Sequence, residues 1–332
     1  MTQEKTIYKC CRIRPLFSVV IPMYNRQDTI SRCLQSVFNQ DYQDFEVIVV
    51  DDCSVDGSVA EVRKYNDPRL RIIQLPNNLG VCGAIKDGVV VAGGSWILTL
   101  GSDDALRPGA LRTFADMTET APKDVGVIGA FGQYDTGGIT PGTPPPEGPF
   151  GYEEYLKWRN EKGPTDYLGC RRRQVYETVR WTDSRRASQK IHLDIARQWK
   201  YWIAHEVLMT VHTDSKNRIT GYLSALSLEF LRRMAKDCAR DMEETLQHYG
   251  KDMLLYAPHW YWRTLQAAAL QNLLAGKKIR GMRFLLCALY HKPWALQLAA
   301  AGVLGLLSSR ALLAVSHLPR ARKVFHFLSR KL

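Results

Sequence analysis

Three groups of polar side chains follow short apolar segments in the N-terminal part of the chain. They are Pro22-Met23-Tyr24-Asn25, Asp51-Asp52-Cys53-Ser54 and Gly101-Ser102-Asp103-Asp104. In an open parallel sheet, ligands bind beyond the carboxyl ends of the strands, which is where these groups would lie. Two neighbouring acidic pairs repel each other unless a divalent cation and ligand donors fill the space between them. The pattern therefore predicts a site for a metal-chelated phosphate ligand.

A single Asp after a strand is commonly a helix N-cap, and this reading stays open for each of the four Asp residues taken alone. Two Asp-Asp pairs at adjacent strand ends are harder to explain as caps. The first strand is not followed by Gly-x-Gly-x-x-Gly, and the chain contains no Gly-Lys-Ser/Thr segment of the Walker type. The sequence thus excludes a dinucleotide fingerprint and a P-loop as the phosphate-binding device.

Short β-branched runs alternate with stretches of helical spacing, which predicts βαβ units on a mostly parallel, Rossmann-like sheet with flanking helices. The expected strands are 17–21, 45–50, 70–75, 96–100 and 125–130. Between the first two, apolar residues from Ile30 to Phe38 form one helical stripe that would pack on the sheet. Pro108 suits the first turn of a further helix, and Arg171-Arg172-Arg173 is expected to end a short strand.

The basic charge of the chain is confined to its C-terminal part. The 332 residues hold 45 Lys plus Arg against 33 Asp plus Glu, a formal net charge of +12, and 45% of them are hydrophobic, which excludes global disorder. No acidic residue follows Asp252, while residues 253–332 hold 12 Lys plus Arg. These bases alternate with long apolar runs, so an anionic membrane surface is the expected partner and nucleic acid is not.

The segment between Lys292 and Arg310 holds 17 uncharged residues, the lower limit for crossing a bilayer. An interfacial or re-entrant helix is therefore the preferred interpretation, with a soluble helical bundle as the alternative. The N-terminus lacks an apolar run, and the eight Cys residues are scattered. The sequence therefore predicts no signal peptide and a reducing, cytoplasmic location at the inner face of the cell membrane.

The run from Phe17 to Asn25, the run from Phe45 to Gly57, Asn77-Asn78-Leu79-Gly80 and Ser102-Asp103-Asp104 together resemble family 2 glycosyltransferases of the GT-A fold, of the bacterial polysaccharide type. The resemblance covers residues 17 to about 131. It implies an inverting transfer of a sugar from a nucleotide diphospho-sugar to an acceptor hydroxyl, assisted by a divalent cation, Mn or Mg. A UDP-sugar is the favoured donor, and a lipid-linked or polysaccharide molecule is the expected acceptor.

The resemblance also assigns roles to single residues of this chain. Pro22, Tyr24 and Asn25 would shape the nucleoside pocket, and Asp52 would accept a hydrogen bond from the base. Asp103 would bind the ribose or a metal-bound water. Asp104 and, further along the chain, His212 would ligate the metal.

Two positions depart from the family pattern. Members often carry Ala-Arg-Asn before the Gly at position 88, whereas this chain has Lys86 in that segment. Lys86 is interpreted as the phosphate-facing cation, with a solvated helix residue as the alternative. The Glu-Asp that supplies the general base in relatives is missing; Asp194 has about the right separation, although a shifted alignment puts Gln198 there, which cannot act as a base.

The predicted organisation has five parts: an N-terminal extension (1–16), a nucleotide-sugar-binding GT-A half (17–136), a Gly/Pro-rich loop (137–151), an acceptor-side half (152–257) and a basic, apolar helical membrane-associated region (258–332). The departures leave a second function open. In it, the chain is a catalytically inactive relative that acts as a membrane-bound binding or scaffold protein.

Overall fold

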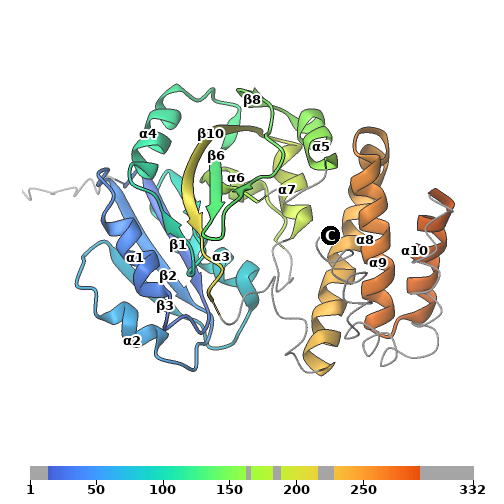
Figure 1. The fold of residues 1–332 in the computed structure, drawn as a ribbon, viewed down its shortest axis with the longest axis horizontal. Helices are drawn as coiled ribbons and strands as arrows, with labels where there is room; N and C mark the ends of the chain where they lie inside the picture. The colour runs from blue at the N-terminus through green and yellow to red at the C-terminus, as the bar shows by residue number, and fades with distance from the viewer. Residues whose placement is uncertain (1–13, 162–165, 182–187, 216–227, 292–332) are drawn as a thin grey trace, which may run out of the picture.

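The structure is a computed structural model that describes residues 14–161, 166–181, 188–215 and 228–291. A ten-stranded sheet forms the centre of its α/β part (Figure 1). Its main path runs β3-β2-β1-β4-β9-β6-β10-β5, with β7 beside β6 and β8 beside β10. The strands are β1 (Phe17–Met23), β2 (Phe45–Asp51), β3 (Leu70–Gln74), β4 (Trp96–Thr99), β5 (Ala105–Leu106), β6 (Val125–Tyr134), β7 (Ile139–Thr140), β8 (Pro149–Phe150), β9 (Leu168–Arg172) and β10 (Lys200–Val211). Strands β1 to β4 are parallel, and β9 is antiparallel to both β4 and β6.

Helices cover both faces of the sheet and form a separate stack beside it. They are α1 (Ile30–Phe38), α2 (Ser58–Arg63), α3 (Gly80–Val91), α4 (Ala110–Thr120), α5 (Tyr152–Asn160), α6 (Val175–Thr178), α7 (Gln189–Ala196), α8 (Leu228–Tyr256), α9 (Pro258–Leu274) and α10 (Lys278–His291). Figure 1 shows α8, α9 and α10 side by side next to the α/β part. The mixed α/β fold with C-terminal helices agrees with the fold class predicted from the sequence.

Alternating side chains of the parallel strands fill two cores. Val19 of β1 packs in the core that contains α1 and α4, and its neighbour Val20 packs in the core under α3. Successive side chains of a strand point to opposite faces, so a strand buried on both faces is apolar throughout. The stripe of α1 is buried as expected, at Ile30, Cys33, Leu34 and Val37.

The structure corrects one part of the predicted organisation. The Gly/Pro-rich segment 137–151 is not without regular structure, because it contains β7, which pairs with β6, and β8, which pairs with β10. The segment 152–257 contributes β9 and β10 to the same sheet as β1, and it also supplies much of a second core around Tyr155, Tyr201 and Tyr249.

The predicted interfacial segment within 292–332 lies outside the described residues, as does the N-terminal segment 1–13. Among the helices that the structure describes, none combines the length and the apolar character needed to cross a membrane.

Candidate active site

The first three polar groups meet at one edge of the sheet because their strands are parallel and in register. Met23 at the end of β1 lies opposite Asp51 at the end of β2, and Val20 lies opposite Thr99 at the end of β4. The loops after β1, β2 and β4 therefore lie next to one another. The predicted convergence of the three polar groups is confirmed for the backbone.

The loops after β1 and β2 are tied together by hydrogen bonds and are locally strained. The Asn25 N–H donates to Ser54 Oγ at 2.9 Å, and the Val55 N–H donates to Asn25 Oδ1 at 2.9 Å. Asn25 (φ 52°) and Cys53 (φ 66°) both adopt the left-handed conformation. Asn tolerates this region, but Cys does so at a cost, and such outliers cluster at functional sites.

Replacing Cys53 with glycine is expected to raise the free energy of unfolding by about 0.5–1 kcal/mol, because glycine adopts a positive φ without steric cost. Urea denaturation followed by circular dichroism measures the change. The matched control Cys287→Gly, at an exposed position inside α10, should lower the same quantity by about 1 kcal/mol. A loss of stability in Cys53→Gly would contradict the assigned strain.

Asp52 is buried and fixes the start of α3. Its two carboxylate oxygens accept the Leu79 N–H at 2.6 Å and the Gly80 N–H at 2.8 Å. A carboxylate at this position caps exposed N–H groups and interacts favourably with the helix dipole. Asp52 therefore acts as a helix cap, the alternative role considered for an Asp that follows a strand. If a nucleotide base also donated an N–H to this carboxylate, it would be the third donor.

The carboxylates of Asp103 and Asp104 turn toward the same space above Gly101. A Cβ built on Gly101 would lie 2.7 Å from Asp104 Oδ2, closer than real Cβ contacts allow, and 3.2 Å from Asp103 Oδ1, which is a tight contact. The Ser215 hydroxyl donates to Asp103 Oδ2 at 2.8 Å, and Arg26 Nε lies 3.8 Å from the same oxygen. Neither Arg26 nor Ser215 belongs to a motif from which this contact could be predicted.

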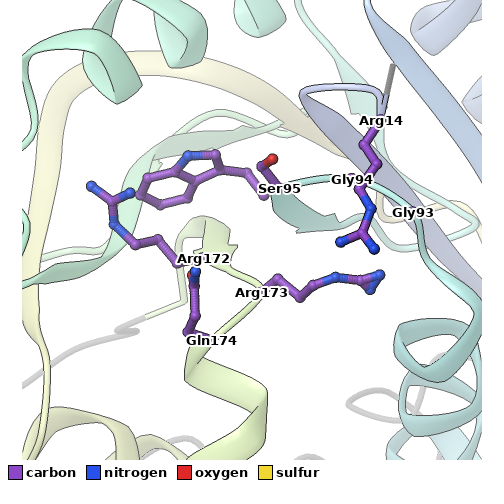
Figure 2. A pocket seen from close by; sticks show the side chains of 8 residues that line it. Arg14, Gly93, Gly94, Ser95, Arg172, Arg173 and Gln174 are labelled. Carbon is purple, nitrogen blue, oxygen red and sulfur yellow. The ribbon is translucent and has the colours of Figure 1, made fainter. Parts of the chain in front are cut away.

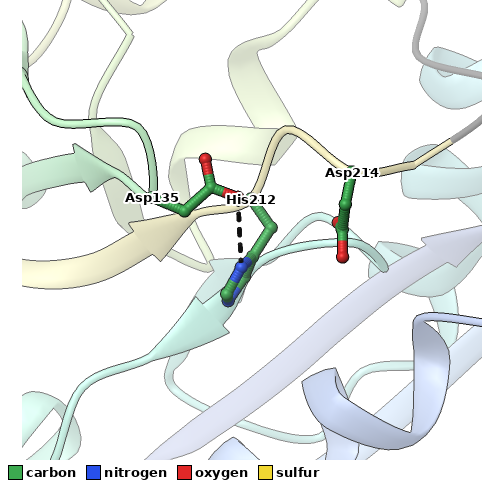
Figure 3. A group of neighbouring side chains, drawn as sticks. All are labelled: Asp135, His212 and Asp214. Atoms are coloured by element: carbon green, nitrogen blue, oxygen red, sulfur yellow. Dashed lines mark ion pairs between the residues drawn. The ribbon is translucent and has the colours of Figure 1, made fainter.

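His212, just beyond the end of β10, lies against the loop after β4. Its backbone N–H donates to Asp104 Oδ1 at 3.2 Å, and its ring Nδ1 lies 3.5 Å from Asp135 Oδ2. Figure 3 shows this ring between Asp135, which follows β6, and Asp214. One ligand atom from each of these three residues lies within 4.8 Å of the others. The structure therefore places the backbone of His212 against Asp104, and it groups the His212 ring with the carboxylates of Asp135 and Asp214.

The donor set fits a divalent cation such as Mn or Mg, since it consists of carboxylate oxygens and one imidazole. Asp135 and Asp214 are already engaged. The Thr213 N–H and hydroxyl donate to Asp135, each at 2.8 Å, and Arg32 donates to both oxygens of Asp214 at 2.8 and 2.9 Å. The ligand atoms that lie together are those of Asp135, His212 and Asp214; Asp104 contacts His212 through the His212 backbone N–H, so its metal-holding role stays a prediction. Asp135 would orient the imidazole through Nδ1, as the hydrogen-bonded partners of metal-ligating His residues commonly do.

Arg32 of α1 links two loops of the site. Besides its bonds to Asp214, it donates to the backbone oxygen of Asp103 at 3.0 Å. The Arg32 guanidinium lowers the pKa of Asp214 to about 2, so this carboxylate is ionised at neutral pH. The pairing could not be read from the sequence, because Arg32 occupies a polar position of an ordinary amphipathic helix and lies 182 residues from Asp214.

Three of the residues predicted to bind the nucleotide-sugar are accessible to solvent to different degrees. Pro22 is partly buried, Tyr24 is exposed beside it, and Lys86 is exposed on α3, where it forms no ion pair with any described residue. All three are compatible with contact to a ligand.

Asp194 does not join the group at the strand ends. Its carboxylate accepts a hydrogen bond from the Tyr249 hydroxyl of α8 and lies 3.6 Å from Lys190 Nζ. Asp194 is only 4% exposed. To take a proton from an acceptor, the carboxylate would have to leave both partners, so this geometry does not support Asp194 as the general base. Gln198, the alternative at that position, donates to the Asp194 backbone oxygen at 3.4 Å.

The family model described as "Glycosyl transferase family 2" matches residues 18–201, more than half of the chain. The chain belongs to this family. The match begins within β1, includes the acidic residues that follow β2, β4 and β6, and stops before His212 and Asp214. The resemblance stated from the motifs is thereby confirmed.

Curated relatives match about a third of this chain. The succinoglycan biosynthesis protein ExoO of Rhizobium meliloti (strain 1021) is 41% identical over 113 residues, 34% of this chain and 32% of that protein. The glycosyltransferase GlyG of Streptococcus pneumoniae serotype 4 is 34% identical over 122 residues, 36% of this chain and 40% of that protein. The matches thus span well under half of these curated relatives.

The fold of this chain is similar to that of a solved structure, S. aureus TarS 1-349 in complex with UDP-GlcNAc. The TM-score is 0.53, with 20% sequence identity over 81% of this chain and 88% of the TarS chain. This similarity extends through most of the described residues and shows a shared GT-A architecture.

Proposed function

We propose that the chain transfers a sugar, with inversion, from a nucleotide diphospho-sugar to a hydroxyl of a lipid-linked or saccharide acceptor in polysaccharide biosynthesis. The observation that carries this proposal is the placement of Asp103, Asp104 and His212 at the carboxyl edge of a family 2 sheet. Carboxylate and imidazole donors at this edge suit a metal-bound diphosphate. ExoO, one of the similar proteins, is named for succinoglycan biosynthesis.

A UDP-sugar is the proposed donor. TarS, whose fold this chain shares, was solved with UDP-GlcNAc. In our proposal Pro22, Tyr24 and Asn25 contact the nucleoside, while Asp52 is within reach of the base from the start of α3. Asp103 binds the ribose or a metal-bound water. Lys86 and Arg26 are cations at the same edge and offset the charge of the diphosphate.

The cation would be held by Asp104 and His212, and when bound it acts as a Lewis acid that stabilises charge developing on the leaving diphosphate. The residues of this chain supply the rest. The Gly101 turn aims both carboxylates at one space, and Asp135 holds the His212 ring. Arg32 keeps the loops after β4 and β10 together through Asp103 and Asp214.

The decisive experiment measures nucleotide release from a panel of UDP-, GDP- and dTDP-sugars with lipid-linked and saccharide acceptors, with and without EDTA. We expect turnover with a UDP-sugar, loss of turnover on metal removal and recovery with Mn or Mg. Turnover that survives exhaustive metal removal would contradict the assigned metal site. Binding of UDP without turnover on any pair would contradict the proposed transfer.

A second candidate function is nucleotide-sugar binding without transfer, in a scaffold protein. One observation favours it: the carboxylate of Asp194 is closed off by Tyr249 and Lys190. The same panel separates the two functions, because a scaffold protein binds UDP and releases no sugar from any donor.

We further propose that the chain associates with the anionic inner face of the cell membrane through its C-terminal region. No acidic residue follows Asp252. On α10, Ile279, Leu286 and Tyr290 are 81%, 61% and 83% exposed, and their spacing puts them on one side of the helix with Arg283. An apolar face flanked by bases is the pattern of interfacial helices.

Changing Ile279, Leu286 and Tyr290 together to serine is expected to weaken binding to phosphatidylglycerol vesicles at least tenfold. The variant lacks the three apolar side chains whose transfer from water into the membrane interface would stabilise the bound state. Co-sedimentation measures the change. The control Val90→Ser removes an exposed apolar side chain from α3 and should leave binding unchanged. If the triple variant sediments with vesicles like the wild type, α10 is not the contact surface.

A further inference from the structure

A cavity of about 250 Å³ lies at the edge of the sheet opposite the candidate active site. It is formed where the turn Gly93–Ser95 leads into β4 and where β9 ends with Arg172, followed by Arg173 and Gln174. Because β9 is antiparallel to β4, the end of β9 lies beside the start of β4, and Trp96 is opposite Arg172. The cavity is thus at the amino ends of the parallel strands. The carboxylates of Asp103 and Asp104 follow β4 at its other end.

Three arginines line this cavity: Arg14, Arg172 and Arg173 (Figure 2). Among the residues that the structure describes, none of the three forms an ion pair with a carboxylate. Glu46, which accepts the Gly93 N–H at this turn, is paired with Arg71 at 2.6 Å. Like charges gathered around one cavity repel each other unless an anion lies between them.

Two of the guanidinium groups are held in place by carbonyl oxygens. Arg172 Nε donates to the Val125 oxygen at 2.8 Å, and its guanidinium lies 4.5 Å from the centre of the Trp96 ring. Arg173 donates to the backbone oxygen of Ala92, at the end of α3. These contacts fix the orientation of both side chains but do not neutralise them. Desolvation lowers the pKa of Arg172, as expected for a charge that is partly buried without a counter-ion.

Arg14 differs from the other two because it is exposed and forms no hydrogen bond through its side chain with any described residue. In Figure 2 its guanidinium lies on the same side of the cavity as that of Arg173. The Arg172 guanidinium turns away from these two groups toward the Trp96 ring, so the fixed cation Arg173 and the adaptable cation Arg14 are the pair suited to a ligand that accepts several charged hydrogen bonds. The planar fork of arginine matches phosphate oxygens in pairs.

We propose that this cavity binds a phosphate group, as a phosphate monoester or diphosphate, at a site separate from the donor site. The Gln174 amide and the Ser95 hydroxyl, which also face the cavity, add neutral donors. Backbone N–H groups contribute little, since those of Gly94 and Ser95 already donate to Ser18 Oγ and the Pro15 oxygen. The phosphate belongs either to a lipid headgroup or to a soluble ester, and the chemistry of recognition is the same.

The proposal goes beyond the proposed function and does not depend on it. The two sites are at opposite ends of β4, whose four residues alone separate them by roughly 10 Å at about 3.3 Å per residue. Failure of sugar transfer would leave the cavity and its charges unchanged, and loss of phosphate binding would not affect the assignment of Asp104 or His212.

Isothermal titration of the full chain with pyrophosphate tests the site. Arg14→Gln removes one guanidinium without breaking a described contact and should weaken binding about tenfold, while Arg14→Lys should weaken it less. Lys251→Gln is the matched control, because it removes one exposed cation from α8, outside both proposed phosphate sites. Equal effects of Arg14→Gln and Lys251→Gln, or an effect of Lys251→Gln alone, would overturn the proposal, as would absence of binding by the wild type.

Vesicles containing phosphatidic acid distinguish the two sources. If Arg14→Gln lowers binding to these vesicles while Lys251→Gln does not, the site takes a lipid headgroup. If Arg14→Gln weakens pyrophosphate binding but leaves vesicle binding unchanged, the site takes a soluble phosphate ester. Either result supports the cavity as a phosphate site.

Discussion

Replacing Asp104 with asparagine is expected to lower kcat/KM for sugar transfer at least 10³-fold, a loss of about 4 kcal/mol of transition-state stabilisation. The change removes the negative charge that would hold the cation. It keeps an oxygen able to accept the His212 N–H, which Asp104 Oδ1 accepts at 3.2 Å. The free energy of unfolding should therefore change by less than about 1 kcal/mol. Steady-state kinetics and urea denaturation check both statements.

A graded series of variants separates Asp104 from its neighbours. Asp135→Asn should cost about 10- to 100-fold, because Asp135 only orients His212. Asp214→Asn should cost less than Asp104→Asn, since Arg32 occupies both oxygens of Asp214. Asp116→Asn, at an exposed position on α4, is the control and should leave activity unchanged. If Asp104→Asn and Asp214→Asn lower kcat/KM equally, the metal would instead be assigned to the group of Asp135, His212 and Asp214.

Replacing Asp194 with asparagine is expected to lower the free energy of unfolding by about 3 kcal/mol, while kcat of the folded protein stays within about tenfold of the wild type. The reason is the burial of the ion pair: the Lys190 and Asp194 side chains are 6% and 3% exposed. Once Asp194 is neutral, the one carboxylate that Lys190 keeps among the described residues is Glu244, at 3.9 Å. Breaking one partner of a buried pair leaves the other charge without compensation.

The pH dependence of kcat distinguishes a structural role of Asp194 in the buried ion pair from a role as the general base. We expect the acid limb of the profile to be the same in Asp194→Asn and the wild type. Disappearance of that limb, with a loss of more than 10³-fold in a folded protein, would restore Asp194 as the base. Asp124→Asn breaks an exposed pair with Lys200 and serves as the stability control, for which little change is expected.

The contacts around Asp194 connect the C-terminal helices to the α/β part. Three polar links join α7 or its cap to α8: Ser188 donates to Asp241, Lys190 lies near Glu244, and Tyr249 donates to Asp194. Burial and the bond from Tyr249 raise the pKa of that hydroxyl, so it remains a donor. Such a network stabilises only when every member is paired, which makes the position of α8 depend on α7.

The parallel strands and the helix Ile30–Phe38 were predictable from the sequence because periodicity is a local property. Five expected strands correspond to β1, β2, β3, β4 and β6, although β6 is longer than predicted, extending to Tyr134. The short strands β7 and β8 were missed, since two-residue strands in a Gly/Pro-rich segment leave no periodic signal. They form because β6 and β10 offer unpaired backbone groups at those points.

By itself, the sequence determined the family, the parallel sheet and the edge at which Asp103 and Asp104 lie, because each of these follows from residues close together in the chain. Only the tertiary structure decided which side chains meet. Asp104 contacts His212 across 108 residues, and Asp194 contacts Tyr249 across 55. The order of β9, β6 and β10 in the sheet and the docking of α8 on α7 create these contacts. A pattern of single residues carries no information on such packing, and this is why Asp194 was assigned as a base while Asp135 was overlooked.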